Sequence, residues 1–345
     1  MTSNSDKLQQ SSMHKELRSS KPIYFPSQFW EELNSKHTDQ LIHYGFKNFK
    51  RTVNMKYFNW GTLGIIRQQL NIVLSQLFQG NLKPLYLSRF RNYNNTKAGN
   101  IKHFNAISAF IYRIFVASYA DYLKATDIKE IFNIASEPKI GNPFIVEYKN
   151  QLLSQDLCNS IHEFYSITNK IAGQSKMNIA EIGAGYGRLA TVFLKVLPQC
   201  TYTIIDIPPA LHVSQKYISA VFPNDRIFFF HSFKSFNQIK KEFISARIRF
   251  ILPHQLEYLP KKYYNLMINI SSFHEMTREQ IKNFVSLIDR LTHGFFYLKQ
   301  WRKSRTSVNS YIKEFDYQFP KNWRLIYRRS PHPIQKMFFD ALYKI

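Results

Sequence analysis

Three glycines within five residues, Gly183, Gly185 and Gly187, stand where a strand-like run passes into a helical pattern. A turn of this kind directs backbone N–H groups and the positive end of the helix dipole at the polar end of a ligand. The next apolar run along the chain ends in Asp206. One carboxylate has two oxygens, so it can accept hydrogen bonds from both hydroxyls of a ribose. The pattern predicts a site for a nucleotide-containing ligand.

The spacing of the glycines argues against a nicotinamide cofactor. A dinucleotide-binding turn follows G-x-G-x-x-G, which brings the pyrophosphate against the helix. Here Arg188 holds the third position and the third glycine is Gly187. Glu181 lies two residues before the first glycine. This E-x-G-x-G-x-G form resembles motif I of the class I S-adenosylmethionine-dependent methyltransferases.

The resemblance implies that S-adenosylmethionine is the cofactor and that the glycine turn leaves room for its methionine part. It also implies adenine contacts in the loop "LPHQLEYLP", which follows the expected third strand. The alternative is a glycine-rich turn that binds nothing, and the combination of Glu181, three glycines and Asp206 disfavours it. The expected cofactor-binding residues are Glu181, Gly183, Ala184, Gly185, Gly187, Asp206, Ile207, His254 and Gln255.

Longer segments carry a second resemblance: "FILPHQLEYLP", "NISSFHEM", "FFYLKQW" and, nearer the N-terminus, "FWEEL" and "IGNPFIVEYKNQLLSQDLCNS". Together they look like the bacterial sugar O-methyltransferase family. The similarity covers nearly all of the chain beyond the first residues. It implies methyl transfer to a hydroxyl of a sugar, a nucleotide-sugar or a glycan, as in polysaccharide biosynthesis.

The segment "SSFHEM" holds the candidate catalytic residues, His274 and Glu275. A sugar hydroxyl is a weak nucleophile at neutral pH, so a nearby general base helps the transfer. Histidine has a suitable pKa range for that task, and Glu275 is the second candidate. The ordinary alternatives are that His274 bonds a loop carbonyl and that Glu275 braces the loop. Because no further carboxylates cluster there, we expect no required metal ion.

The formal net charge of +24 raises a competing interpretation, binding of nucleic acid. Much of the charge is scattered in pairs such as Lys240-Lys241 and Arg328-Arg329, which favours compositional bias. An acceptor with an anionic group also fits. We expect no specific nucleic acid partner, although methylation of RNA ribose or of another small molecule stays an alternative. A non-catalytic binding module with the same fold is a further alternative.

The elements that position these residues fall into three parts. Residues 1–21 are polar and predict a disordered tail, and residues 22–172 a mainly helical substrate or cap region. Residues 173–345 alternate short apolar strands with helices, which predicts a Rossmann-like α/β domain with helices on both faces of a parallel sheet. For the third strand, "ARIRFILPH" is favoured over the earlier "RIFFFHSF". The last two apolar runs close the sheet as a pair.

The helical region is expected to cover the carboxyl edge of the sheet, where ligands of open α/β sheets bind. Its segment "YGFKNFKRTVNMKYFNW" offers aromatic rings for a sugar face and cations for a phosphate, or simply packs between the domains. The first residues contain no apolar leader, and no apolar stretch is long enough to span a bilayer. Two cysteines give no disulfide framework. We therefore expect a cytoplasmic protein.

Overall fold

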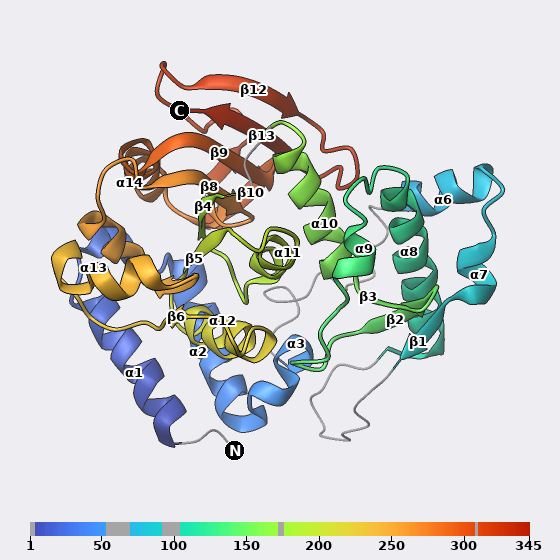
Figure 1. Cartoon of the computed structure of the whole chain (residues 1–345), viewed down its shortest axis with the longest axis horizontal. Coiled ribbons are helices and arrows are strands. Elements are labelled where there is room, and N and C mark those ends of the chain that lie inside the picture. Colours follow the sequence, from blue (N-terminus) through green and yellow to red (C-terminus); the bar gives the residue numbers. More distant parts are fainter. Residues whose placement is uncertain (1–3, 53–69, 92–103, 172–175, 308–309) are drawn as a thin grey trace.

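The computed structural model is built around one large sheet (Figure 1). It describes residues 4–52, 70–91, 104–171, 176–307 and 310–345. The spatial order of the eight strands is β12-β13-β9-β8-β4-β5-β7-β6, and β13 alone runs against the others. The strands are β4 (Asn178–Ile182), β5 (Thr201–Ile205), β6 (Ile227–Phe228), β7 (Ile248–Ile251), β8 (Tyr264–Ile270), β9 (Thr292–Trp301), β12 (Arg324–Arg329) and β13 (Phe338–Lys344).

The central strands are short apolar runs buried along most of their length. In both β4 and β5 only the first residue is partly exposed. Continuous apolar runs of this kind suit parallel strands, because helices cover both faces of the sheet. The chain passes from β4 to β5 on one side and later returns to β8 on the other side of β4. The carboxyl end of β4 is therefore a topological switch point, the usual place for a ligand.

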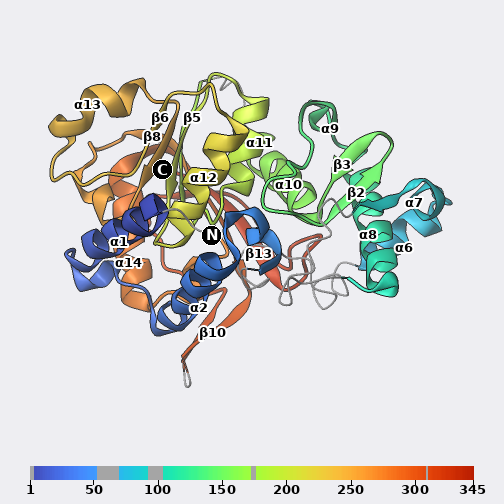
Figure 2. The ribbon, with the colours of Figure 1, turned by 90° about the horizontal axis from the view of Figure 1, so that it is seen from below.

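Helices lie on both faces of this sheet (Figure 2). Right-handed crossovers put the helices after β4 and β5 on one face. The connection from β8 to β9 moves across the sheet in the opposite direction from the connection between β4 and β5. Its helix therefore lies on the other face. These elements are α10 (Gln155–Thr168), α11 (Arg188–Val196), α12 (Ala210–Val221), α13 (Phe236–Ser245) and α14 (Arg278–Leu291), with the short helices η3 (Pro253–Tyr258) and η4 (Phe273–Glu275).

Several local predictions are confirmed. The favoured third strand is β7, which pairs directly with β5, whereas the earlier run gives only the two-residue edge strand β6. Strands β12 and β13 close the sheet as the expected pair. The helices of the sheet also have local caps: Ser154 caps α10 by accepting from the Leu157 N–H, and Thr277 forms a capping box with Gln280 at α14.

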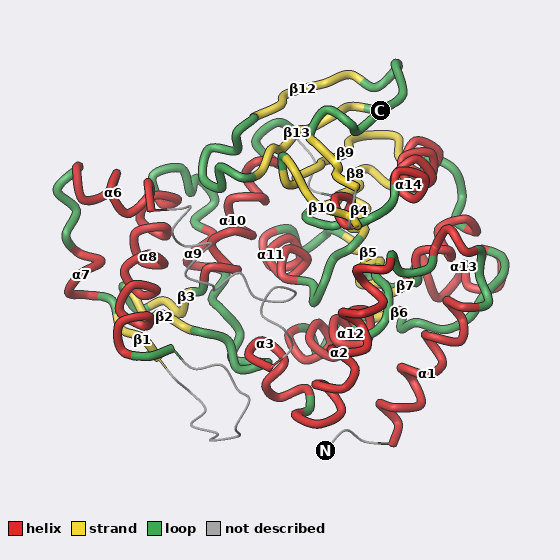
Figure 3. The backbone as a smooth tube through the Cα atoms, turned by 180° about the vertical axis from the view of Figure 1, so that it is seen from behind, coloured by secondary structure: helices red, strands yellow, loops and turns green. Residues whose placement is uncertain are grey.

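The N-terminal region is mainly helical, with a small antiparallel sheet β1-β2-β3 (Figure 3). The predicted boundary between residues 172 and 173 lies outside the described residues. The elements are α1 (Asn4–Arg18), η1 (Pro22–Tyr24), α2 (Gln28–Tyr44), η2 (Phe46–Asn48), α3 (Phe49–Thr52), α6 (Leu70–Phe78), α7 (Lys83–Leu87), β1 (Arg89–Arg91), α8 (Ala106–Lys124), α9 (Ile131–Ile134), β2 (Ile145–Tyr148) and β3 (Gln151–Leu153). A separate hairpin pairs β10 (Lys303–Ser307) with β11 (Ser310–Lys313).

The expectation of a disordered tail over residues 1–21 is wrong for its described part. Residues 4–18 form α1, in which Met13 and Leu17 are buried in the core. Apolar burial offsets the entropy of ordering this polar segment. Its polar side chains also find partners, since Glu16 accepts from the hydroxyl of Ser232 at 2.7 Å. Within the described ranges, no helix has the length and apolarity needed to cross a bilayer.

Candidate functional site

The glycine turn joins β4 to α11 at the switch point of the sheet. Gly183 donates to the carbonyl of Ile205 at 2.8 Å, which ties the turn to the end of β5. Gly183 has φ of +72°, and a Cβ there would lie 2.3 Å from Ser272 Oγ, so only glycine fits. At Gly185 an added Cβ would meet no atom of the described residues within 4 Å. Among those residues, the turn therefore packs on the loop after β8 on one side and is open on the other.

Asp206 is bonded to the glycine turn. Its Oδ2 accepts from the Gly185 N–H at 2.7 Å and its Oδ1 from the Ile207 N–H at 2.7 Å. Burial raises the pKa of Asp206 to about 7; these two donors oppose the rise, and the carboxylate of Glu275 adds to it. Each oxygen keeps a lone pair, so the carboxylate can still accept from a vicinal diol. Asp206 and Ile207 thus lie beside the turn, where the sequence analysis expects them.

Glu181 lies in the core rather than beside the free space at Gly185. Its side chain is buried, and its Oε2 accepts from the hydroxyl of Tyr202 at 2.8 Å. Burial raises the pKa of Glu181 to about 8, although the Tyr202 hydrogen bond and Arg188 lower it. Its expected part in cofactor binding stays a prediction.

The loop after β8 is held by a chain of buried amides. Asn269 donates to the carbonyl of Ile182 at 2.8 Å, at the entrance to the glycine turn. Gln300 on β9 donates from Nε2 to Asn269 Oδ1 at 2.6 Å and to the Asn269 carbonyl at 3.3 Å. Its Oε1 accepts from the His274 N–H at 3.2 Å and lies 2.8 Å from His274 Nδ1. Backbone partners at both ends therefore fix the orientation of the Gln300 amide.

This orientation decides the tautomer of His274. Because Gln300 Oε1 can only accept, Nδ1 of His274 has to donate, and the neutral ring presents its lone pair at Nε2. Nε2 lies 3.4 Å from Oε1 of Glu275. The His274 side chain is 4% exposed and that of Glu275 22%, so Glu275 is the more accessible of the two. The two side chains together can accept a proton. The charge of Glu275 also raises the pKa of Asp206.

His254 and Gln255, expected at the adenine, have other partners here. Gln255 Oε1 accepts from the Leu252 N–H at 2.8 Å, and its Nε2 donates to the His231 carbonyl at 2.9 Å. His254 Nε2 lies 3.4 Å from Glu16 of α1. Burial lowers the pKa of His254, and Glu16 opposes that change. Gln255 thus holds the loop together, and an adenine contact by either residue stays a prediction.

The N-terminal segment contacts the loops at this edge of the sheet. Ser27 donates to the backbone carbonyl of Glu275 at 2.9 Å. Gln280 donates to the carbonyl of Phe25 at 2.8 Å, and Tyr24 donates to Glu257 at 2.7 Å. The backbone of Glu275 and the first turn of α14 are thus held by a segment about 250 positions away in sequence.

Lys50 and Arg51, offered above as cations for a phosphate, are buried in packing roles. Lys50 donates to Glu137 at 2.6 Å and lies between the rings of Tyr186 and Tyr217, 4.5 and 4.6 Å from their centroids. Arg51 donates to the Asn142 carbonyl at 2.8 Å. Residues 53–60 of that segment lie outside the described residues.

The buried support of the turn by Lys50 and Glu137 was missed by the sequence analysis. Tyr186 belongs to the glycine turn itself, and its hydroxyl donates to Asp156 at 2.9 Å. A second buried ion pair joins Arg188, the first residue of α11, to Glu163 at 2.5 Å. Lys299 contacts the same carboxylate at 2.8 Å. The sequence signal for this network was a charged residue inside an otherwise apolar element, and it holds for Glu163 in α10 and Lys299 in β9.

Acidic, histidine and cysteine side chains do not gather in threes at a spacing that could hold a metal ion within the described parts of the chain. The residues at the switch point instead fit a cofactor that carries a ribose. Asp206 offers free lone pairs to a diol, and the open side of Gly185 leaves room for the chain attached to the sugar.

No protein-family model and no curated protein matches the chain. It is similar to a solved SAM-dependent methyltransferase from Aquifex aeolicus, with 12% identity over 53% of this chain and 88% of that one, and a TM-score of 0.35. It is also similar to Burkholderia thailandensis 1,6-didemethyltoxoflavin-N1-methyltransferase, with 11% identity over 66% and 86% of the chains and a TM-score of 0.35. That structure contains 1,6-didemethyltoxoflavin and S-adenosylhomocysteine.

Haemonchus contortus phosphoethanolamine N-methyltransferase 1, in complex with phosphoethanolamine and S-adenosylhomocysteine, shares 13% identity over 55% of this chain and 43% of that one, with a TM-score of 0.33. Similarities of this size concern the architecture alone. The function has to be argued from the side chains of the site.

Proposed function

We propose that the protein is an S-adenosylmethionine-dependent O-methyltransferase whose acceptor is a hydroxyl of a sugar or glycan. The observation that carries the proposal is that Asp206, bonded to the glycine turn, and the His274–Glu275 pair, on the loop that packs against Gly183, lie at the same edge of the sheet. Asp206 can accept hydrogen bonds from the ribose diol of the cofactor. The His274–Glu275 pair can accept the proton that the sugar hydroxyl loses when it is methylated.

Asp206 and the glycine turn bind the cofactor. The two oxygens of Asp206 accept from the ribose hydroxyls, and the turn, open at Gly185, leaves space for the methionine part. When bound, S-adenosylmethionine supplies the methyl group from its sulfonium to the attacking oxygen. Positioning supplies much of the rate in such a displacement.

His274 and Glu275 hold the proton that the acceptor hydroxyl loses. When the His274 ring is neutral, its Nε2 and Oε1 of Glu275 face each other as two acceptors 3.4 Å apart. The proton that leaves the acceptor hydroxyl is shared between them as a hydrogen bond. Glu275 is the more exposed member of the pair, and Gln300 keeps Nδ1 of His274 protonated, so that Nε2 is the nitrogen that accepts the proton.

Calorimetric titrations with S-adenosylhomocysteine and with NAD test the cofactor assignment. We expect saturable binding of the first and none of the second. Asp206→Asn should weaken binding, whereas Asp39→Asn, a change at an exposed position on α2, should not. NAD binding without S-adenosylhomocysteine binding contradicts the proposal.

Transfer of a labelled methyl group tests the acceptor. The wild-type chain is incubated with labelled S-adenosylmethionine and either a panel of nucleotide-sugars and glycans or total RNA. We expect label in the carbohydrate fraction and none in RNA at physiological salt. Label in RNA ribose supports the alternative acceptor and contradicts the sugar.

A further inference from the structure

Helices α6 and α7 form one end of the molecule, away from the glycine turn (Figures 1 and 2). On α6 the residues Leu70, Leu74, Leu77 and Phe78 recur at helix spacing on one face, and all of them are exposed. Phe78 is 88% exposed. The opposite face, with Ile72, is buried. An apolar helix face is therefore turned to the outside instead of to the core.

The exposed apolar surface continues into α7. Leu82, Tyr86 and Leu87 are all exposed there, beyond the turn that ends α6. Single exposed apolar residues are ordinary, but a run along one helix and into the next marks an interaction surface. We call residues 70–87 with these outward side chains the α6–α7 face.

The surroundings of the α6–α7 face are cationic. Residues 70–87 contain no Asp or Glu, and Lys83 is their one charge. A cavity of about 760 Å³ lies between α6, α7 and the end of α8, with Lys83, Lys124 and Lys149 in its wall. The acidic residue of the cavity, Asp121, is already paired with Lys149 at 2.7 Å. It also accepts from Tyr148 at 2.6 Å and Asn81 at 2.8 Å, so Lys83 and Lys124 dominate the charge that a ligand meets.

An apolar face beside a cationic hollow matches a bilayer surface, which offers acyl chains below anionic headgroups. A free anion would use the lysines but leave the exposed Leu74 and Phe78 without a function. A second copy of the chain would present the same residues 70–87, which offer no Asp or Glu to Lys83. Charge complementarity therefore selects the bilayer.

We propose that the α6–α7 face binds the surface of membranes that contain anionic phospholipids. Leu74, Phe78 and Tyr86 enter the interfacial layer, and Lys83 and Lys124 bind headgroup phosphates. The proposal goes beyond methyl transfer and does not depend on it. If both hold, the enzyme works beside lipid-linked glycans.

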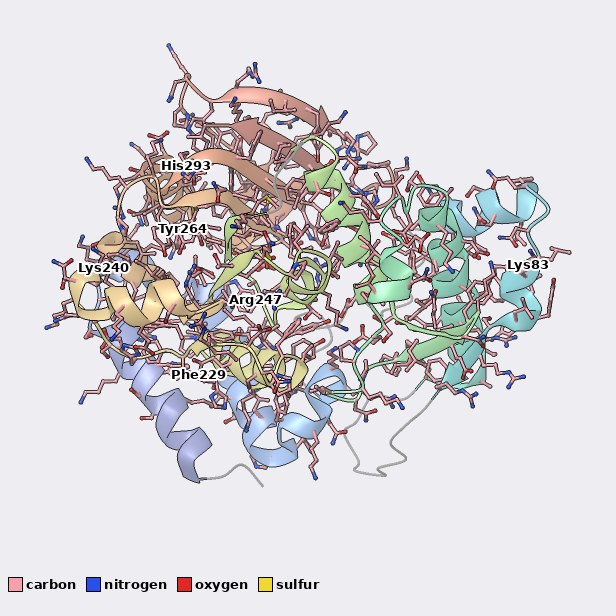
Figure 4. All side chains as sticks on the ribbon, in the orientation of Figure 1. Lys83, Phe229, Lys240, Arg247, Tyr264 and His293 are labelled. Atoms are coloured by element: carbon pink, nitrogen blue, oxygen red, sulfur yellow. The ribbon has the colours of Figure 1, made fainter. Side chains whose placement is uncertain are left out.

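Co-sedimentation with vesicles tests this proposal. Wild-type protein is mixed with vesicles of equal parts phosphatidylcholine and phosphatidylglycerol, or of phosphatidylcholine alone. We expect binding to the first that weakens as salt is raised, and little binding to the second. Lys83→Glu should lower the partition coefficient about tenfold, since each cation near such a surface contributes several-fold. Lys240→Glu, at the opposite end of the molecule, is the matched control and should change it less than about twofold (Figure 4).

The apolar part is tested with the double variant Leu74→Ser, Phe78→Ser. Both side chains are exposed, so the fold should persist, and Phe315→Ser serves as a control at a residue that is 79% exposed. We expect vesicle binding to fall about tenfold or more in the double variant and to stay unchanged in the control. Unchanged titration with S-adenosylhomocysteine shows that the variants are folded, and it separates this question from that of the cofactor.

Three results would overturn the proposal. The first is failure of the wild-type chain to bind the anionic vesicles. The second is binding of inorganic phosphate at Lys83 without vesicle binding, which reduces the cavity to an anion site. The third is a lipid-free dimer in analytical ultracentrifugation that the Leu74→Ser, Phe78→Ser variant dissociates, which assigns the α6–α7 face to a second copy.

Discussion

Protonation of Asp206 should control cofactor affinity near neutral pH. Burial raises the pKa of this carboxyl to about 7 in the absence of ligand. The ribose hydroxyls need the ionised form as acceptor, so binding favours loss of the proton. The affinity for the cofactor should therefore be highest above a pH of about 7 and should fall as the pH drops below that value.

The size of the effect follows from the ionised fraction. With a pKa of about 7, this fraction is roughly nine-tenths at pH 8 and one-tenth at pH 6. The dissociation constant for S-adenosylhomocysteine should therefore be about tenfold higher at pH 6 than at pH 8. Asp206→Asn should remove most of this slope. It should also weaken binding at pH 8 by about 1.5–3 kcal/mol, the usual loss when a charge-assisted hydrogen bond is removed.

Calorimetry at pH 6, 7 and 8 and constant ionic strength measures both quantities. Repeating the pH 7 titration in buffers of different ionisation enthalpy counts the released proton, expected at about one half per site from the ionised fraction. The slope that remains in Asp206→Asn reports other groups, such as Glu181, whose pKa burial raises to about 8. Equal affinities at pH 6 and 8, or the same slope in both proteins, would refute the reasoning.

Three further predictions concern His274, Gln300 and Lys50. His274→Ala should lower kcat by about a hundredfold to ten-thousandfold, as expected for loss of a general base, with little change in cofactor affinity; wild-type turnover would exclude His274. Gln300→Leu removes the acceptor of His274 Nδ1. It should lower kcat more than it changes KM and move the midpoint of the pH–rate profile, and an unmoved midpoint would limit Gln300 to packing. Lys50→Met leaves Glu137 buried without its cation and should cost about 3–5 kcal/mol of unfolding free energy in urea titrations. The double variant with Glu137→Gln should recover part of that loss, and additive effects would contradict the pairing.

Local patterns account for what the sequence predicted correctly. The helix caps Ser154 and Thr277 are local in the same way, because a cap bonds only to residues within its own first turn. The strand β7 and the closing pair β12–β13 followed from short apolar runs between turn signals. The prediction for α1 failed because its buried residues, Met13 and Leu17, depend on contacts with distant segments.

The sequence by itself determined the glycine turn and its pairing with Asp206, since a turn after one strand and an acid at the end of the next parallel strand must meet. Only the tertiary structure decided which charges remain available to ligands. Lys50 is paired with Glu137, 87 positions away in sequence, and His254 contacts Glu16, 238 positions away. Periodicity likewise predicts that a helix such as α6 has an apolar face, but it cannot say whether another element covers that face. Burial depends on contacts between distant segments, which no local pattern contains.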